Sequence, residues 1–347
     1  MNSFKKNWTI GICVFLLVFL FQNNSMNAQD IHFSQIGNSP LNISPALTSV
    51  FSGDVRFVGN YKSQWQAVPV NYMTFAGSYE MKFLNKNMPN SQFGGGLIFN
   101  YDQAGYGDLS LSQLGVNLGY THQMSEHNFL SGGFQISANQ RMFKPQQLSF
   151  DDQFDGEIFN SDLGSAEVFD DPSFLFLNFS AGINWHYQVP EKRTRLDLGA
   201  SIFNLNEAPQ SFLNRKRKDI VLAQRIHVHG MGSVMVAENM DLSFLGLLTK
   251  QGPYSETIVG FGAKIYLNKT MTKELSIQVG ANYRVGDAII PTFEIDFRNM
   301  IKLGLSYDVN TSGFTEATNG KGSPEFSIIY TLRKVKPLDE KKLCPLY

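Results

Sequence analysis

Apolar and polar residues alternate with a period of two along almost the whole chain, and this alternation limits the fold more than any other feature. In the segment 275–284 the apolar positions are Leu275, Ile277, Val279, Ala281 and Tyr283. Successive side chains of a β-strand point to opposite faces of the sheet. Each such segment is therefore predicted to be a strand with one apolar face and one polar face.

About fourteen segments of this kind follow one another, each around ten residues long. They begin near residues 55, 71, 92, 107, 128, 173, 194, 220, 240, 254, 275, 288, 299 and 324. Helical spacing of comparable strength is absent from the sequence. After residue 28 the sequence also lacks an apolar run of roughly 18 residues, which excludes a helical membrane protein.

Strands of about ten residues with one apolar face suit a tilted crossing of a lipid bilayer. An even number of strands lets the sheet close, so that no backbone edge is left unpaired in lipid. We therefore predict an all-β protein, a transmembrane antiparallel β-barrel of about 14 strands of the outer-membrane type over residues 55–333. A soluble β-sandwich or repeat protein is the alternative fold.

The lengths of the connections support the barrel. Numbered in order, the odd connections include the three longest, at residues 144–172, 205–219 and 309–323, whereas the even ones are short. Outer-membrane barrels have short turns on the periplasmic side and long loops outside. Tyrosines at the ends of the apolar faces are expected to form an aromatic girdle, namely Tyr61, Tyr101, Tyr120, Tyr187, Tyr283 and Tyr307.

The first residues are typical of a secretory signal. Lys5 and Lys6 precede an apolar run over 10–21, and polar residues follow as far as Ala28. We expect residues 1–28 to be a signal peptide cleaved after Ala28. An uncleaved anchor is the alternative, but a helix that spans a bilayer needs about 20 apolar residues.

Charge and cysteine content exclude several classes of protein. The formal net charge is -1 and charged residues make up 17% of the chain, which does not fit a basic nucleic-acid binder. The two cysteines are Cys13 and Cys344, and Cys13 leaves with the signal peptide. The exported chain then has one thiol, which excludes an internal disulfide and a cysteine-based metal site.

In a barrel the polar faces turn inward, because a charge on the lipid side near mid-membrane costs roughly 2 to 4 kcal/mol. This places both signs of charge in the lumen or at its rims, where they could pair across it and partly close it. The charged residues assigned to the lumen in this way are Arg56, Glu80, Arg195, Asp197, Arg225, Lys264, Arg284, Glu294, Asp296, Arg298 and Lys302.

The sequence gives little support for catalysis or for a bound cofactor. His227 and His229 share one face of a strand and are possible metal ligands, but a third ligand is not evident and Arg225 on the same face would oppose a cation. The chain has no phosphate-binding glycine loop and no serine, histidine and acid set with suggestive spacing. We therefore predict no catalytic residues, no cofactor and no metal site.

The candidate partner-binding residues lie in the odd connections. The 144–172 loop is acidic and includes Asp151, Asp152 and Asp155, without the spacing of a helix-loop-helix calcium site. The 205–219 loop contains the basic run Arg215, Lys216, Arg217 and Lys218. These loops could pair with each other or contact lipopolysaccharide or a protein. In the first connection, Trp65 and Pro69 could anchor a partner or simply pack in the loop.

The segment before the first strand contains the motifs that suggest a family. It reads His32-Phe33-Ser34-Gln35, Pro40-Leu41, Ser44-Pro45-Ala46, and then Tyr61-Lys62-Ser63-Gln64-Trp65 and Val68-Pro69. This pattern resembles the PorP/SprF family of type IX secretion system membrane proteins. The family commonly has Asn where Ser44 stands and Arg where Lys62 stands.

The resemblance implies an outer-membrane component of the type IX secretion system, in some bacteria linked to gliding motility. Its expected partners are a secreted cargo protein with a type IX C-terminal domain, other secretion components and outer-membrane lipid, with no nucleic acid. Residues 29–54 are expected to lie in the periplasm or cap the lumen, and residues 334–347 to form a periplasmic tail. The alternatives are a diffusion channel or hydrophobic-solute transporter, and an outer-membrane enzyme.

Overall fold

The structure is a computed structural model. It describes residues 31–64, 72–84, 88, 90–105, 107–154, 156–158, 160, 169, 172–212, 220–270, 273–313 and 322–333. Within these ranges, no helix has the length and apolar character needed to cross a membrane.

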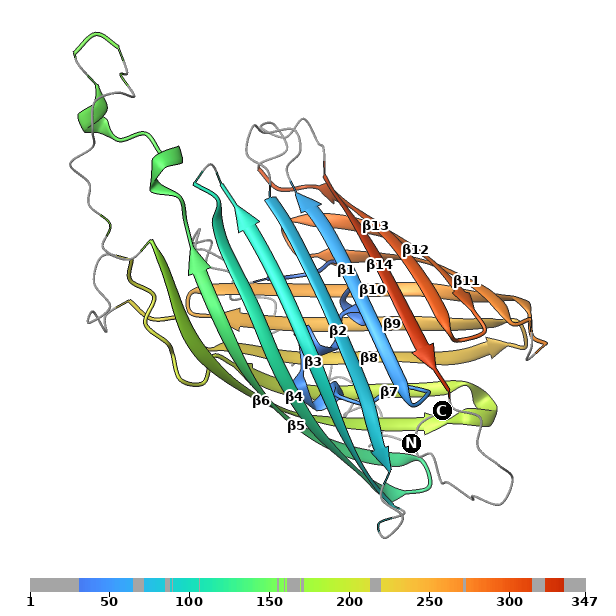
Figure 1. The fold of residues 1–347 in the computed structure, drawn as a ribbon. Helices are drawn as coiled ribbons and strands as arrows, with labels where there is room; N and C mark the ends of the chain where they lie inside the picture. The colour runs from blue at the N-terminus through green and yellow to red at the C-terminus, as the bar shows by residue number, and fades with distance from the viewer. Residues whose placement is uncertain are drawn as a thin grey trace, which may run out of the picture.

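The described chain is a closed antiparallel β-barrel in which each strand pairs with its neighbours in sequence and β14 pairs with β1 (Figure 1). The predicted fold is confirmed. The strands are β1 (Val55–Gln64), β2 (Tyr72–Leu84), β3 (Ser91–Ala104), β4 (Leu109–Ser125), β5 (Asn128–Met142), β6 (Ser173–Val189), β7 (Thr194–Phe203), β8 (Arg225–Ala237), β9 (Met240–Gln251), β10 (Tyr254–Asn268), β11 (Leu275–Arg284), β12 (Ala288–Phe297), β13 (Ile301–Asn310) and β14 (Ser323–Leu332).

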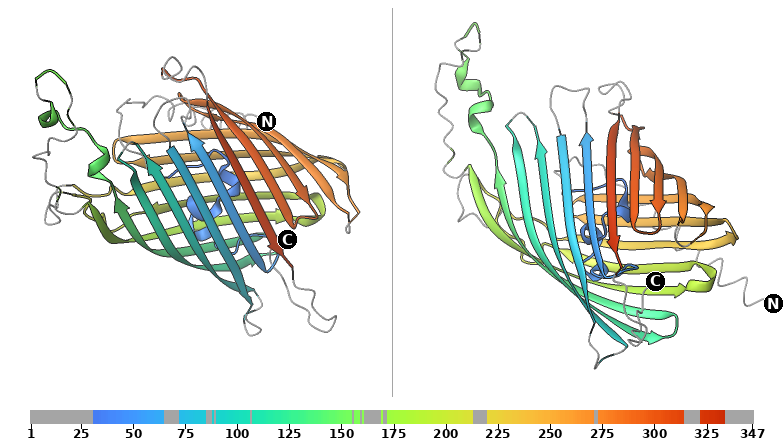
Figure 2. Two further views of the ribbon diagram at one scale, coloured as in Figure 1. Left: turned by 45° about the horizontal axis from the view of Figure 1, so that its top comes forward. Right: turned by 45° about the vertical axis from the view of Figure 1, so that its right-hand side comes forward.

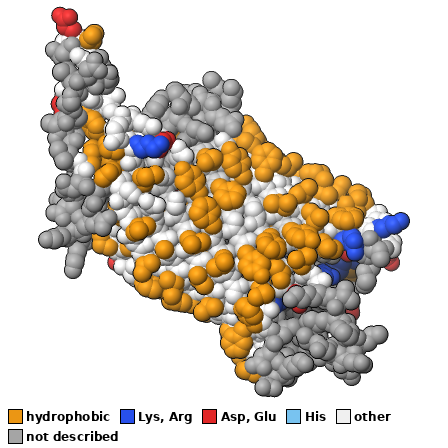
Figure 3. Space-filling model, in the orientation of Figure 1, with side chains coloured by type: hydrophobic (Ala, Val, Ile, Leu, Met, Phe, Trp, Pro, Cys, Tyr) orange, Lys and Arg blue, Asp and Glu red, His pale blue; other side chains and the backbone are white. Residues whose placement is uncertain are grey.

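The alternation of the sequence becomes an apolar outer surface and a polar lumen. On β13, Leu303 and Leu305 are 48% and 47% exposed on the outside, whereas Asp308 is 5% exposed on the inside. Apolar side chains cover the outer wall visible in Figure 3. This surface is suited to hydrocarbon, and the closed sheet leaves no strand edge to be solvated.

Four strands begin one to five residues later than the sequence predicts, at Tyr72, Leu109, Arg225 and Ile301. The strand expected near residue 220 begins at Arg225, since the loop forms its own bridge between Pro209 and Val221. The strand expected near 299 begins at Ile301, since Asn299 has a φ of 49° and belongs to a turn.

The connections sort between the two ends of the barrel as the sequence predicts. We call the end that carries the β5–β6, β7–β8 and β13–β14 connections the long-loop end, and the other the short-turn end. The β5–β6 connection includes the short helices η3 (Pro145–Gln147) and η4 (Asp151–Gln153) and extends far from the barrel (Figure 1). At the short-turn end, η5 (Pro190–Lys192) joins β6 to β7.

Residues 31–53 lie inside the barrel, and we call them the lumen segment (Figure 2). The segment contains η1 (Ile36–Asn38), α2 (Pro40–Ile43) and η2 (Pro45–Leu47). Prolines begin two of these short helices, at positions where the missing N–H costs no helical hydrogen bond. These short helices make the segment compact. The segment thereby fills space in the lumen that the wall side chains do not occupy.

Candidate functional site: the filled lumen and the long-loop end

The lumen segment runs lengthwise through the barrel. At its start, the carbonyl of Ile31 accepts a hydrogen bond from Arg225, the first residue of β8 at the long-loop end. At its finish, the N–H of Asp54 donates to the carbonyl of Leu332, the last residue of β14 at the short-turn end. The chain therefore crosses from one end of the lumen to the other before β1 begins.

A cluster of buried charges holds the segment near the long-loop end. The Ser34 hydroxyl donates to Asp308 Oδ2 at 2.8 Å and accepts from Lys62 Nζ at 2.9 Å. It also accepts from Arg284 Nη2 at 2.8 Å. Asp308 Oδ2 lies 3.2 Å from Lys62 Nζ and 3.1 Å from Arg284 Nη1. Buried ions are stable only when they are paired and hydrogen-bonded. The Ser34 hydroxyl supplies hydrogen bonds to all three charged side chains that the wall residues alone do not provide.

Glu325 on β14 binds the next part of the segment through its main chain. Its two carboxylate oxygens accept from the N–H groups of Ser34 and Gln35 at 2.7 and 2.9 Å. Farther along, Asn38 Nδ2 donates to Glu294 Oε1 at 2.8 Å and to Ser327 Oγ at 3.0 Å. Side chains of β14 and β12 thus fix η1 against one side of the lumen.

A second carboxylate holds the segment near the short-turn end. Glu80 is fully buried and accepts from the N–H of Ser49 at 3.1 Å. Its other oxygen lies 2.7 Å from Arg56 Nη2. The ammonium of Lys82 donates to the carbonyl of Phe51. The segment is therefore bound at both ends by acidic and basic wall residues.

Between these ends the wall is lined by glycines that let two backbones meet. Gly94, Gly119, Gly133 and Gly182 are register partners on β3, β4, β5 and β6 and face the lumen. A Cβ added at Gly119 would lie 2.8 Å from the carbonyl oxygen of Thr48, and one at Gly133 would overlap Pro45. Because these four glycines have no side chains, the backbone at η2 can lie directly against the sheet.

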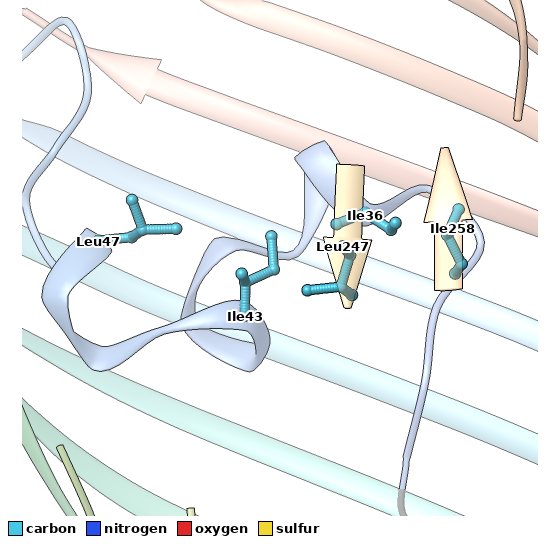
Figure 4. Close-up of a cluster of buried hydrophobic side chains, with 5 residues drawn as sticks. All are labelled: Ile36, Ile43, Leu47, Leu247 and Ile258. Atoms are coloured by element: carbon cyan, nitrogen blue, oxygen red, sulfur yellow. The ribbon is translucent and has the colours of Figure 1, made fainter. Parts of the chain in front are cut away.

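The opposite side of the segment is apolar and meets an apolar patch of the wall. Ile36, Ile43 and Leu47 of the segment cluster with Leu247 on β9 and Ile258 on β10 (Figure 4). All five are buried. Burying such side chains contributes roughly 1.5 to 3 kcal/mol each. The segment is therefore packed as part of the fold.

Many polar contacts of the wall are made to main-chain groups of the segment. In addition to those of Glu325 and Glu80, the Ile43 carbonyl accepts from Ser201 Oγ at 2.7 Å. The Ser34 carbonyl accepts from Asn282 Nδ2 at 3.0 Å, and the Ser49 carbonyl from Gln92 Nε2 at 3.3 Å. Each buried main-chain group paired in this way avoids a desolvation cost of about 1 to 3 kcal/mol.

A cavity of about 590 Å³ remains beside the segment, with a lining that runs from Gln35 and Asn282 near the long-loop end to Asn299 at the short-turn end. Val50 and Phe51 of the segment line it, together with Arg195 and Asp241 of the wall. At the long-loop end, the space beside Ile31 and His32 is only about 40 Å³. The unfilled volume thus runs beside the segment and reaches the short-turn end.

The charges predicted for the lumen are found there or at its rims, but their ion pairs run along the wall. Lys264 Nζ lies 2.9 Å from Asp296 Oδ2, and Lys302 Nζ lies 3.4 Å from Glu294 Oε2. The two members of each pair lie on strands at most two apart. The expected pairing across the lumen is thus replaced by pairing along the wall, because the segment occupies the space between facing walls.

The two histidines singled out by the sequence are both buried in the lumen. The Nδ1 of His227 lies 3.0 Å from the carbonyl oxygen of Ile43, and Nε2 of His229 lies 3.0 Å from Asn184 Oδ1. His186 lies 2.8 Å from Asp197 in the same region. Among the residues that the structure describes, no three His, Cys, Asp or Glu side chains are placed to hold a metal ion.

Of the predicted partner-binding residues, Asp151 and Asp152 are described, and both are exposed on η4. Trp65, Pro69, Asp155 and the run Arg215, Lys216, Arg217 and Lys218 lie outside the described residues. The structure therefore places part of the acidic loop.

An aromatic cluster, which the sequence reasoning missed, joins the bases of the two long loops. The ring of Phe212, from the β7–β8 connection, lies 4.6 Å from that of Phe143 and 5.1 Å from that of Phe174. Phe143 is also 4.9 Å from Phe169. Such ring pairs contribute about 0.5 to 1.5 kcal/mol beyond area burial. The cluster fixes where the acidic loop leaves the barrel.

An ion pair links this loop to the β3–β4 turn. Lys144 Nζ lies 2.8 Å from Asp108 Oδ2, and the Lys144 N–H donates to the Gly107 carbonyl at 2.7 Å. The hydrogen bond from Lys144 lowers the pKa of Asp108 below its usual value. The carboxylate in turn raises the pKa of Lys144.

Comparison with protein families shows a match over residues 25–330 to the family described as "Type IX secretion system membrane protein PorP/SprF". Comparison with curated protein sequences finds no match. The family match covers the lumen segment and nearly the whole barrel.

Solved structures with a similar fold are outer-membrane barrels. The toluene transporter TbuX of Ralstonia pickettii has a TM-score of 0.54 at 11% identity, over 86% of this chain and 94% of that chain. A FadL homologue of Pseudomonas aeruginosa has a TM-score of 0.47 at 9% identity, over 84% and 93% of the two chains. At such low identity the likeness shows the fold alone.

Proposed function

Because the chain belongs to the PorP/SprF family of type IX secretion system membrane proteins, we propose that it assists the export or surface retention of a partner adhesin or secreted protein. It does so without catalysis, as an outer-membrane component of the secretion apparatus. In this proposal the chain is exported behind a cleaved signal peptide, and the short-turn end faces the periplasm.

The observation that carries the proposal is the occupied lumen. Wall residues from many strands bind the lumen segment at both ends, and wall glycines admit its backbone between them. A protein built to pass small solutes needs a continuous path, whereas a protein that holds partners needs rigid end surfaces. A packed lumen supports the second role, with binding at the two ends of the barrel.

The long-loop end supplies the surface for the cargo. The exposed residues Asp151 and Asp152 lie on a loop whose base is fixed by the Phe143 cluster. The β1–β2 and β7–β8 connections join strands at the same end, and the sequence predicts further partner-binding residues in them. We assign the cargo to this end and the other secretion components to the short-turn end.

Deletion of the gene, followed by profiling of surface and medium proteins, tests the function. We expect loss of one surface or secreted protein while general export and outer-membrane permeability stay intact. Altered permeability with normal secretion would instead favour a diffusion channel or hydrophobic-solute transporter. A spreading assay on the same strain tests the link to gliding motility.

Crosslinking in intact cells tests the assignment of the ends. A photo-reactive residue at Asp151 on the long-loop end is expected to capture a secreted protein with a type IX C-terminal domain. The same residue at Glu191, exposed in η5 at the short-turn end, serves as the matched control. Recovery of lipopolysaccharide alone, or of nothing, from Asp151 would contradict the assignment.

A further inference from the structure

The lumen segment begins at the long-loop end of the barrel. Strands of an even-numbered barrel return to the side on which they start, so both ends of the chain are ordinarily expected at one side. Here Arg225, which binds the Ile31 carbonyl at 3.3 Å, is the first residue of β8 at the long-loop end. Ile31 and His32 also share a small cavity with Gln251 and Tyr254, which flank the β9–β10 turn at that end.

Successive contacts show that the chain descends steadily from there. Ser34 meets Asp308, two residues before the end of β13, and Ser49 meets Glu80 near the other end of β2. At the short-turn end, Lys82 donates its N–H to the carbonyl of Asp54 at 3.0 Å. The direction of the segment is therefore fixed by contacts along its whole length.

We infer that the exported chain begins at the cell surface, so that its first residues are part of the face that the long loops present to a partner outside the cell. The inference rests on the orientation in the proposed function, with the short-turn end in the periplasm. Cleavage after Ala28 leaves two residues ahead of Ile31, which span at most about 7 Å. A ten-residue strand such as β1 extends about 33 Å. Two residues are thus too few to return the chain to the periplasmic end.

The two ends of the barrel domain then face opposite compartments. Arg333, which follows β14, donates to Ser52 Oγ at 2.6 Å at the short-turn end. Ile31 begins the segment at the other end. A surface partner can reach the start of the chain, and a periplasmic partner the residues after β14.

Cysteine labelling in intact cells tests this topology. Replacing Cys344 with Ser removes the remaining thiol of the exported chain. In that background we would make His32→Cys, Ser52→Cys and Asp151→Cys and treat cells with a membrane-impermeant maleimide. We expect labelling at positions 32 and 151 in intact cells, and at position 52 only after the outer membrane is permeabilised.

The possible failures are distinguishable. Labelling at position 52 alone in intact cells would overturn the orientation and the inference with it. Labelling at 151 in intact cells, with 32 reacting only after permeabilisation, would overturn the path while leaving the orientation. If position 32 reacts in neither case, an epitope tag after Gln29 decides, since antibody binding to intact cells supports the inference and binding only after permeabilisation refutes it. Protein profiles of the same strains report on export separately.

Discussion

At the scale of single residues, the wall glycines set how closely the lumen segment approaches the sheet. Gly133 faces the segment, and a Cβ there would overlap Pro45. At the preceding residue, Gly132, an added Cβ would have no heavy atom within 4 Å. The two positions differ in little except the side of the wall they face. They therefore form a matched pair for testing the packing of the lumen.

We predict that Gly133→Val destabilises the folded barrel by about 1 to 3 kcal/mol, as overpacked cores do. Gly132→Val on the lipid side is expected to change stability by no more than about 1 kcal/mol. Urea unfolding in lipid vesicles measures both. Equal effects of the two substitutions would show that Pro45 does not press against the wall at this point.

The Asp108–Lys144 pair gives a pH-dependent prediction outside the membrane-spanning strands. Because Lys144 lowers the pKa of Asp108 in the folded protein, the contribution of the pair to loop stability is present above the unfolded pKa of about 3.9 and is lost as the pH falls through the lower folded pKa. We expect an NMR titration of the Asp108 carboxyl to have its midpoint below that of an ordinary aspartate, and Lys144→Gln to raise it. An unchanged midpoint in the variant would exclude Lys144 as the cause.

At the scale of elements, Glu325 of β14 binds the lumen segment through its main chain. The carboxylate accepts two main-chain N–H groups at 2.7 and 2.9 Å. In Glu325→Gln one acceptor oxygen is replaced by a donor that faces an N–H, so a buried group loses its partner at a cost of about 1 to 3 kcal/mol.

We therefore predict faster hydrogen exchange of the lumen segment in Glu325→Gln, with the exchange of β4 and β5 little changed. Glu238→Gln, in the exposed β8–β9 turn, is the control and is expected to match the unaltered chain. Hydrogen-exchange mass spectrometry in nanodiscs measures the difference. Uniformly faster exchange over the barrel would mean that the segment does not open separately from the wall.

The strands could be predicted from the sequence because each has its own alternation, as at Leu275 and Ala288, where the predicted starts are exact. The starts at Arg225 and Ile301 were missed by a few residues, since turn geometry has no such period. The position of the lumen segment could not be derived from residues 29–54, which lack a repeating pattern. The residues that indicate its position lie in the wall. Leu247 interrupts the alternation of β9, and the lumen-facing glycines are recognised as register partners only once the strand pairing is known.

At the scale of the whole molecule, the barrel combines a lipid-facing wall with a lumen filled by its own chain. The family match places it in type IX secretion, and similar solved structures show that the same fold is found in transporters of small apolar molecules. The lumen segment occupies the interior of this barrel, and we propose that it closes the path that a transported solute would take. The remaining space of about 590 Å³ runs beside the segment.

Electrical recording on the purified full chain in planar bilayers tests this closure most directly. We predict that the unaltered protein gives no steady conductance, while Lys62→Met, which removes a fully buried ammonium that binds Ser34 and Asp308, gives intermittent openings. A steady open-channel current from the unaltered chain would contradict the filled lumen and the function we derive from it.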